Sequence, residues 1–283
     1  MSRLQWNFSE YDDPGALPLF IDLQVTGFAG IDLLTAQSVE DIHKVAKAIL
    51  ASGIGAFQPA LTPAPLDQML RAITLIESAR RENRENQAEI VGIHLEGPFL
   101  NPEFSSIHPV KDLKKPDLKV LTSYLTAGVI TSMTISPEVE GALDLIKFLT
   151  GMGVGVWIGY SSADIERSRE ALEAGAIGFT DLSDPRSKKL LQYALEESDG
   201  YLKVILDSEG SIDLIARAQD RVIALSELGV EGSLRSGFEK LLAAGLSLES
   251  CVMACAGNAA RSIARMELGE VEFGRLAQRF SQF

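Results

Sequence analysis

The sequence predicts an α/β fold, a (β/α)8 barrel of the TIM type. Eight short apolar, β-prone segments alternate with amphipathic helical patterns along a chain of 283 residues. Several helical patterns end at a glycine, which is a common helix stop before a following strand. An open doubly wound sheet is the alternative, but no expected strand is followed by the Gly-rich GxGxxG turn that usually accompanies that fold.

The strands are expected where the sequence is nearly continuous in apolar residues, because barrel strands are covered on both faces. We place them at residues 19–25, 55–61, 90–95, 129–135, 154–158, 176–180, 202–206 and 222–225. Since function in such a barrel sits at the carboxyl ends of its strands, the residues that directly follow these segments are the first candidates for a site.

The helices are expected between the strands. The first begins after Ser38, with Glu40 and Asp41 in its first turn, which favours a helix N-terminus. We place the set at residues 39–51, 66–83, 117–126, 140–150, 163–173, 188–197, 212–218, 237–244 and 248–265. Residues 1–18 are polar and broken by prolines, so we expect an N-terminal arm there and a single barrel domain over residues 19–283.

The composition argues against two classes of partner. The formal net charge is −13, whereas nucleic acids and anionic membranes are bound by basic faces. The longest apolar runs are well short of a membrane span, and no basic-then-apolar leader opens the chain, so we expect a soluble cytoplasmic protein. Cys251 and Cys255 lie four residues apart in an apolar helical pattern, and we expect both to be buried thiols.

The most informative stretch is residues 92–109. It places Glu96 at the end of the third expected strand, directly before Gly97-Pro98, where the strand must stop. A carboxylate there costs free energy unless a cation or hydrogen-bond donors satisfy it, which is typical of a ligand or active-site group. A helix-capping or salt-bridged glutamate is the alternative. The loop that follows contains His108.

The segment HLEGPF (His94–Phe99), followed at the same spacing by NPE and by His108-Pro109, resembles the signature of N-acetylglucosamine-6-phosphate deacetylases in the amidohydrolase superfamily. The resemblance implies a metal-dependent barrel in which Glu96 is a metal ligand and His108 contacts the sugar. Residues 269–280 resemble the family's return into a small β-sandwich, and the resemblance implies that this second domain is mostly or wholly missing.

The other strand ends depart from the family's pattern. Gln24 and Thr26 stand where the resemblance places a His-x-His pair, and Tyr160 and Asp181 where it places two further metal-binding histidines. The resemblance also assigns substrate-lining positions to Thr62 and Asp184 and the position of the catalytic base to Glu227. The chain has only three histidines, His43, His94 and His108, so the family's His-rich site cannot be assembled. We expect His43 to have a surface or packing role in the first helix, and His94 to be a core residue bonded to a carboxylate.

These departures predict a deacetylase-like barrel with an eroded metal site, a degenerate enzyme with a binding or regulatory role. We expect no cofactor, with magnesium or manganese at Glu96 and Asp181 as a lesser alternative, because oxygen ligands suit hard cations and zinc favours imidazole and thiolate. The expected ligand is a small sugar phosphate, and the resemblance leaves a homodimer open. Two other functions stay open: an active hydrolase on an N-acetylated amino-sugar phosphate with a changed metal set, and a metal-independent acid/base enzyme.

Overall fold

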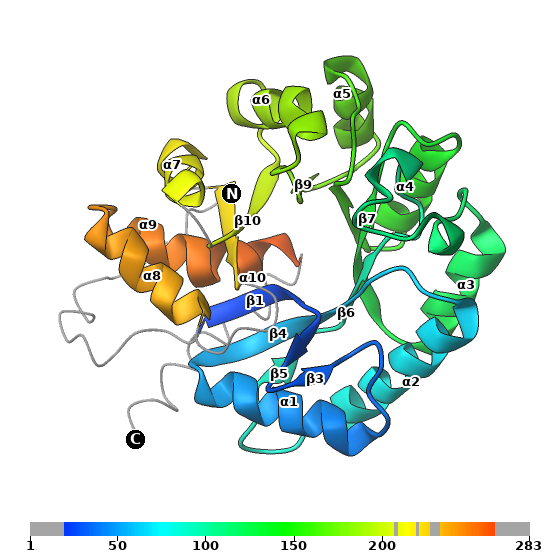
Figure 1. Ribbon diagram of the computed structural model, residues 1–283, viewed down its shortest axis with the longest axis vertical. Coiled ribbons are helices and arrows are strands. Elements are labelled where there is room, and N and C mark those ends of the chain that lie inside the picture. Colours follow the sequence, from blue (N-terminus) through cyan, green and yellow to red (C-terminus); the bar gives the residue numbers. More distant parts are fainter. Residues whose placement is uncertain (1–19, 207–208, 219–220, 227–232, 264–283) are drawn as a thin grey trace.

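Eight parallel strands form the centre of the molecule. The structure is a computed structural model that describes residues 20–206, 209–218, 221–226 and 233–263. The strands are β1 (Phe20–Val25), β4 (Ile54–Leu61), β6 (Ile93–Glu96), β7 (Ile130–Ile135), β8 (Gly155–Ile158), β9 (Gly178–Phe179), β10 (Tyr201–Ile205) and β11 (Val222–Leu225). They follow one another in this order around one sheet, and each hydrogen-bonded pair is parallel. The barrel expected from the sequence is therefore confirmed (Figure 1).

The helices lie outside the strands (Figure 1). They are α1 (Val39–Ala51), α2 (Leu66–Glu82), α3 (Leu118–Ala127), α4 (Ala142–Gly151), α5 (Ile165–Glu173), α6 (Lys188–Glu196), α7 (Glu209–Ala218), α8 (Ser233–Ala243), α9 (Leu248–Val252) and α10 (Asn258–Ser262). The bounds of α1 match those expected. The Ser38 side chain accepts a hydrogen bond from the Asp41 amide, and one face of the helix, with Ile42, Val45 and Ile49, is fully buried.

The third expected strand is broken in two. Short β5 (Glu89–Ile90) pairs with β4, and β6 begins only at Ile93. Gly92 separates them with a φ of +126°, a backbone conformation that an L side chain rarely adopts. A Cβ there would also lie 2.3 Å from the Thr131 side chain. The expectation of one continuous strand over residues 90–95 was therefore wrong, because the chain bends at this glycine.

The last expected helix is also divided. A π-helical turn, Met253–Gly257, separates α9 from α10 and packs against β11 and β1. Cys251 and Cys255 in this stretch are buried free thiols, as expected. Within the described residues the helix ends at Ser262, three residues before the expected end. The expected N-terminal arm, residues 1–18, and the family-like segment 269–280 both lie outside the described residues and stay predictions.

The first and last strands meet through side chains. No ladder pairing joins β1 to β11 within the described residues. Instead the carboxylate of Asp22, on β1, accepts hydrogen bonds from the backbone amides of Gln24 and Ser226, both at 3.1 Å. Asn258 donates from α10 to the carbonyl oxygen of Val222 at 2.7 Å. The barrel is therefore closed at this seam by a buried carboxylate and by the helix packed over it.

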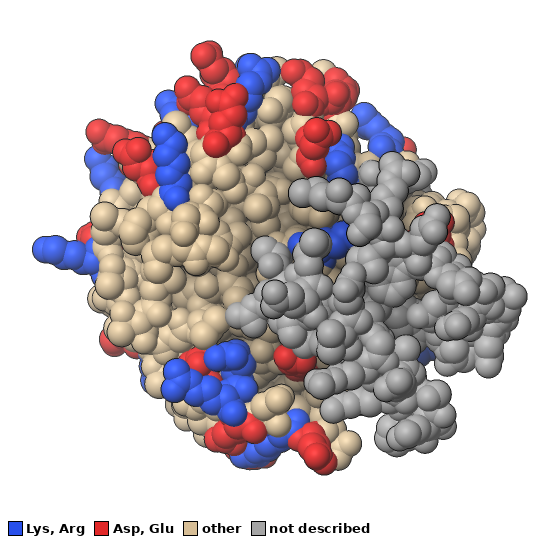
Figure 2. All heavy atoms as spheres, turned by 180° about the vertical axis from the view of Figure 1, so that it is seen from behind, with Lys and Arg blue, Asp and Glu red and all other residues tan. Residues whose placement is uncertain are grey.

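Charged side chains lie mainly around the rim of the face that Figure 2 shows. Lysines and arginines alternate there with aspartates and glutamates, so the described part of this face carries no large region of one sign. Within the described residues, no helix combines the length and the apolar character that crossing a membrane requires.

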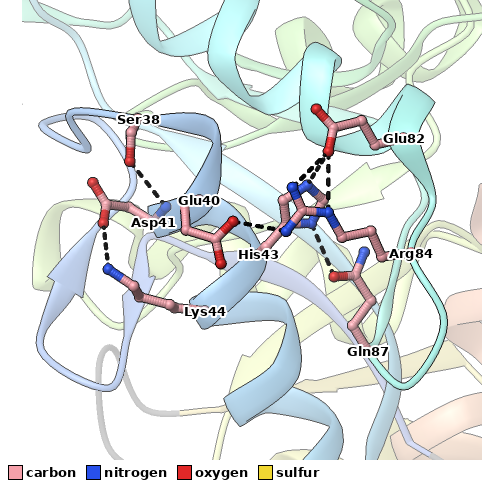
Figure 3. A network of polar contacts seen from close by, with 8 residues as sticks. All are labelled: Ser38, Glu40, Asp41, His43, Lys44, Glu82, Arg84 and Gln87. Atoms are coloured by element: carbon pink, nitrogen blue, oxygen red, sulfur yellow. Dashed lines mark hydrogen bonds and ion pairs between the residues drawn. The ribbon is translucent and has the colours of Figure 1, made fainter.

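A polar network fixes α1 to the end of α2 (Figure 3). His43, only 4% exposed, holds Gln87 through Nδ1 and Glu82 through Nε2, both at 2.9 Å. Arg84 in turn donates to Glu82 and to Glu40, at 2.7 Å to the latter. The packing role expected for His43 is thus accompanied by two specific contacts.

We expect His43→Ala to lower the free energy of unfolding by about 2 kcal/mol, because it removes two hydrogen bonds and leaves a cavity between α1 and α2. Urea denaturation followed by circular dichroism measures the change. Lys44→Ala, one residue away on the exposed face of the same helix, is the matched control and should leave stability almost unchanged. Equal effects of the two substitutions would contradict this role for His43.

Candidate functional site

Glu96 lies at the end of β6 and is 5% exposed. Its Oε1 accepts a hydrogen bond from the Tyr160 hydroxyl at 2.7 Å, and its Oε2 accepts one from Gln24 Nε2 at 3.1 Å. Gln24 comes from β1 and Tyr160 directly follows Gly159 at the end of β8, so three separate strands converge on one carboxylate. The donors satisfy a charge that burial would otherwise make costly.

His108 reaches the same carboxylate from the loop after β6. Its Nε2 lies 3.0 Å from Glu96 Oε1, within ion-pair distance, but the two atoms are not aligned for a hydrogen bond. The ring packs edge-on against Tyr160, with 4.5 Å between ring centroids, and is 3% exposed. Within the described residues, Nε2 is therefore a buried nitrogen without a hydrogen-bond partner, which is unusual outside functional sites.

Asp181 completes the group from the end of β9. Burial and then the charge of Glu96 raise the pKa of its carboxyl group to about 6, and its hydrogen bond with Thr180, at 2.8 Å, partly opposes the rise. Burial, with these two carboxylates, keeps the pKa of Tyr160 far above its ordinary value, so the phenol stays a donor.

Tyr160 and Asp181 share a backbone feature. Their φ angles are +48° and +54°, in the left-handed region that non-glycine residues seldom occupy. Such conformations persist where surrounding contacts over-determine them, and they concentrate at binding and catalytic sites. Tyr160 is held in this conformation by its hydrogen bond to Glu96, and Asp181 by the hydrogen bond it accepts from Thr180.

A buried lysine, Lys203 on β10, is the main site residue that the sequence reasoning missed. Its Nζ donates to the carbonyl oxygen of Leu23 and to Gln24 Oε1, both at 3.4 Å, and lies 4.5 Å from the centre of the Trp157 ring. Burial lowers the pKa of this amine to about 8, although Asp181, Glu96 and Asp22 act to raise it. One charged residue inside the otherwise apolar run 202–206 is the signal that would have found it.

His94 lies deeper in the barrel and is fully buried. Its Nδ1 lies 2.7 Å from the Ser132 hydroxyl and its Nε2 lies 3.0 Å from the Thr134 hydroxyl. Burial holds the pKa of the ring well below its ordinary value, so it is neutral. The expectation of a carboxylate partner was wrong: the register of β7 brings two hydroxyl groups to the ring, so His94 is a core residue that positions strands.

The remaining candidates are not joined to this group by side-chain contacts. Asp184 binds Arg186, at 2.7 Å between Oδ2 and Nη2, and that arginine lowers the pKa of the carboxyl group to about 2. Thr62 follows β4 and Thr26 follows β1, and both are half-buried. Glu227, the expected base, lies outside the described residues.

The donor set does not fit a zinc ion. Zinc sites in proteins are built from imidazole, thiolate and carboxylate groups, typically with at least three protein ligands. Within the described residues no group of three or more His, Cys, Asp or Glu side chains could hold a metal. Both oxygens of Glu96 already accept hydrogen bonds, and the phenol of Tyr160 is kept protonated.

We expect Asp181→Asn to raise stability near neutral pH by about 1 kcal/mol, because a half-buried charge repelled by Glu96 is removed. The pKa of Asp181 is raised in the folded protein, so the protonated carboxyl group stabilises the fold. This stabilisation is fully present below the ordinary pKa of 3.8 and is lost as the pH rises through about 6. The gain in the variant should therefore be larger at pH 7.5 than at pH 4.5, as measured by urea denaturation.

Asp184→Asn is the matched control for that measurement. Arg186 lowers the pKa of Asp184, so the stabilisation it supplies is present above the ordinary value of 3.8 and is lost as the pH falls through about 2. The control should lose stability at pH 7.5, where Asp181→Asn gains it. A gain in both variants, or a gain that does not depend on pH, would contradict the charged environment assigned to Asp181.

Comparison with known proteins gives related sequences and folds, while no family model matches the chain. The sequence is 32% identical over 173 residues to N-acetylglucosamine-6-phosphate deacetylase of Bos taurus. This match covers 58% of the chain and 41% of the bovine protein, so the chain matches less than half the length of that relative.

Solved structures show the same fold. The crystal structure of N-acetyl-D-glucosamine-6-phosphate deacetylase from Mycobacterium smegmatis matches with a TM-score of 0.75 at 24% identity, over 87% of this chain and 76% of that one. A mutant of that enzyme in complex with N-acetyl-D-glucosamine-6-phosphate matches with a TM-score of 0.75 at 22% identity, over 88% of this chain and 77% of that one. The identity is low, so these two matches bear on the fold alone.

Proposed function

Since the curated and structural homologues of this chain are N-acetylglucosamine-6-phosphate deacetylases of the amidohydrolase superfamily, we propose that its barrel binds an amino-sugar phosphate without hydrolysing it. The observation that carries the proposal is the state of Glu96. At the strand ends where the resemblance places metal ligands, Gln24 and Tyr160 instead donate hydrogen bonds to its two oxygens. The site then offers fixed polar groups for recognition and no metal-activated water.

The choice of ligand rests on two facts. A relative with the same fold was solved in complex with N-acetyl-D-glucosamine-6-phosphate. His108, which the family resemblance places against the sugar, keeps a buried ring nitrogen that has no hydrogen-bond partner among the described residues. A sugar hydroxyl or the N-acetyl oxygen would supply the missing partner, since imidazole can donate or accept according to its tautomer.

A metal-independent acid/base enzyme is the second candidate. It is favoured by Asp181, whose raised pKa of about 6 suits a group that exchanges protons near neutral pH. Catalysis of this kind would appear as isomerisation or elimination of a sugar phosphate, with no acetate released. The binding function takes precedence because Asp181 already accepts a hydrogen bond from Thr180 within the site.

Isothermal titration calorimetry tests the proposal. We expect N-acetylglucosamine 6-phosphate to bind with one site per chain and an affinity that a chelator does not change. His108→Ala should weaken binding about tenfold, the equivalent of about 1.4 kcal/mol for one buried hydrogen bond. His43→Ala, the same substitution away from the strand ends, is the control and should bind as wild type does.

Two results would count against the proposal. One is binding that requires added zinc, magnesium or manganese, which would point to a hydrolase with a changed metal set. The other is no heat of binding with N-acetylglucosamine 6-phosphate, with glucosamine 6-phosphate or with N-acetylgalactosamine 6-phosphate.

A further inference from the structure

The side chain of Lys203 lies across the interior of the barrel. It starts on β10 and reaches Leu23 and Gln24 on β1 and the Trp157 ring on β8. Neither β1 nor β8 is adjacent to β10 in the sheet. The amine therefore occupies a central position in the barrel. Lys203 is only 4% exposed, and lysine side chains are rarely buried to this extent in proteins.

Three carboxylates act on the charge of this amine, although none of those described forms an ion pair with it. Asp22, Glu96 and Asp181 each stabilise the charged form of Lys203. In the other direction, the lysine favours the ionised forms of Asp22 and Asp181. A buried ammonium is costly unless opposite charges compensate it, and the same holds for the carboxylates. The lysine and this acidic set thus depend on one another.

Gln24 connects the lysine to Glu96. An ammonium group can only donate hydrogen bonds, so it fixes the oxygen of the Gln24 amide toward itself. The amide nitrogen then points the other way and donates to Glu96 Oε2 at 3.1 Å. The Thr180 hydroxyl lies 3.4 Å from the same Gln24 oxygen, but its single proton is shared with the closer Asp181 carboxylate. Removing the ammonium would free the amide to turn and would leave Glu96 with one donor fewer.

We propose that the Lys203 ammonium is the resident cation of this site: it replaces a divalent metal by balancing Asp22, Glu96 and Asp181 and by holding Gln24 against Glu96. The proposal rests on the proposed function only in that wild-type protein holds no metal. A divalent ion approaching Glu96 meets a fixed positive charge in a region of low dielectric, so the lysine also excludes the ion that it replaces.

The test measures metal binding before and after the charge is removed. Lys203→Met keeps the length of the side chain and loses the charge. We expect manganese to bind this variant at least about tenfold more tightly than wild type, because the repulsion is gone and the carboxylates are uncompensated. Thermal unfolding with a manganese titration is the readout, since a ligand that binds the native state raises its Tm. Asp181→Asn in the same chain should abolish the gain.

Two controls isolate the charge at this position. Lys203→Arg keeps a cation and should bind manganese no better than wild type. Lys189→Met removes an exposed lysine on α6 and should also leave manganese binding unchanged, although it alters net charge by the same amount. If Lys203→Met alone does not fold, manganese or the added Asp181→Asn substitution should restore folding by relieving the repulsion among the carboxylates.

The proposal is overturned if Lys203→Met folds without gaining manganese affinity, or if neither manganese nor Asp181→Asn rescues an unfolded variant. It is also overturned if wild-type protein binds one divalent ion that is lost in Glu96→Gln. The proposed function fails separately: loss of sugar-phosphate binding in wild type would refute it and leave the role of Lys203 standing.

Discussion

Purified protein is expected to release no acetate from N-acetylglucosamine 6-phosphate above the uncatalysed rate, with or without added zinc. Water bound to zinc in hydrolases ionises with a pKa of about 7, whereas the pKa of free water lies far higher. Each pKa unit corresponds to about 1.4 kcal/mol, so without the metal the barrier to attack on the amide is several kcal/mol higher. Nothing among the described residues replaces it, because Tyr160 stays protonated and Glu96 is fully hydrogen-bonded.

Acetate can be followed by proton NMR over a day at high protein concentration. The same preparation must bind the sugar phosphate in calorimetry, so that absence of turnover is not confused with misfolded protein. Acetate release that a chelator stops would contradict the prediction and would favour the hydrolase with a changed metal set. Release that a chelator does not affect would instead favour a metal-independent mechanism.

Restoring two imidazoles should create a zinc site. We expect Tyr160→His combined with Asp181→His to raise zinc affinity by about two orders of magnitude or more, since two imidazoles and Glu96 complete the three-ligand set typical of zinc hydrolases. The backbone favours the change, because histidine is among the residues that occupy left-handed φ angles more readily. Adding Lys203→Met should strengthen binding further.

The matched control is Tyr160→His combined with Asp184→His. It introduces the same number of histidines, but Asp184 belongs to the pair with Arg186 and not to the group around Glu96. Competition with a chromophoric chelator measures the zinc affinity of each variant. Equal affinity in the two double variants would mean that Asp181 does not face Glu96 as the structure has it.

The barrel itself could be predicted from the sequence because its signals are local. Buried parallel strands are apolar runs, and α1 begins at a serine cap followed by two acidic residues. The division of the third strand at Gly92 and the π turn Met253–Gly257 could not be predicted. A Cβ at Gly92 would meet Thr131 on the neighbouring strand β7, and a single-sequence pattern does not show such a contact.

Less of the site could be predicted from the sequence. A carboxylate before Gly97-Pro98 marked Glu96, and strand order placed Gln24, Tyr160 and Asp181 beside it. The hydrogen-bond partners of His94 could not be predicted, because they depend on the register between β6 and β7. Lys203 was not recognised as a site residue, since a single lysine does not change the apolar pattern of a strand. Its role follows only from its position inside the barrel.

The seam between β1 and β11 has a consequence for how the chain folds. The hydrogen bond between Asp22 and Ser226 joins residues 204 positions apart in sequence. During synthesis β1 leaves the ribosome long before β11, so the Asp22 carboxylate stays solvated until nearly the whole barrel has been made. Contacts of such separation slow folding because the entropy of loop closure is lost before the contact forms. The closing step of the barrel is thus the one that exposes nascent strand edges longest to other chains.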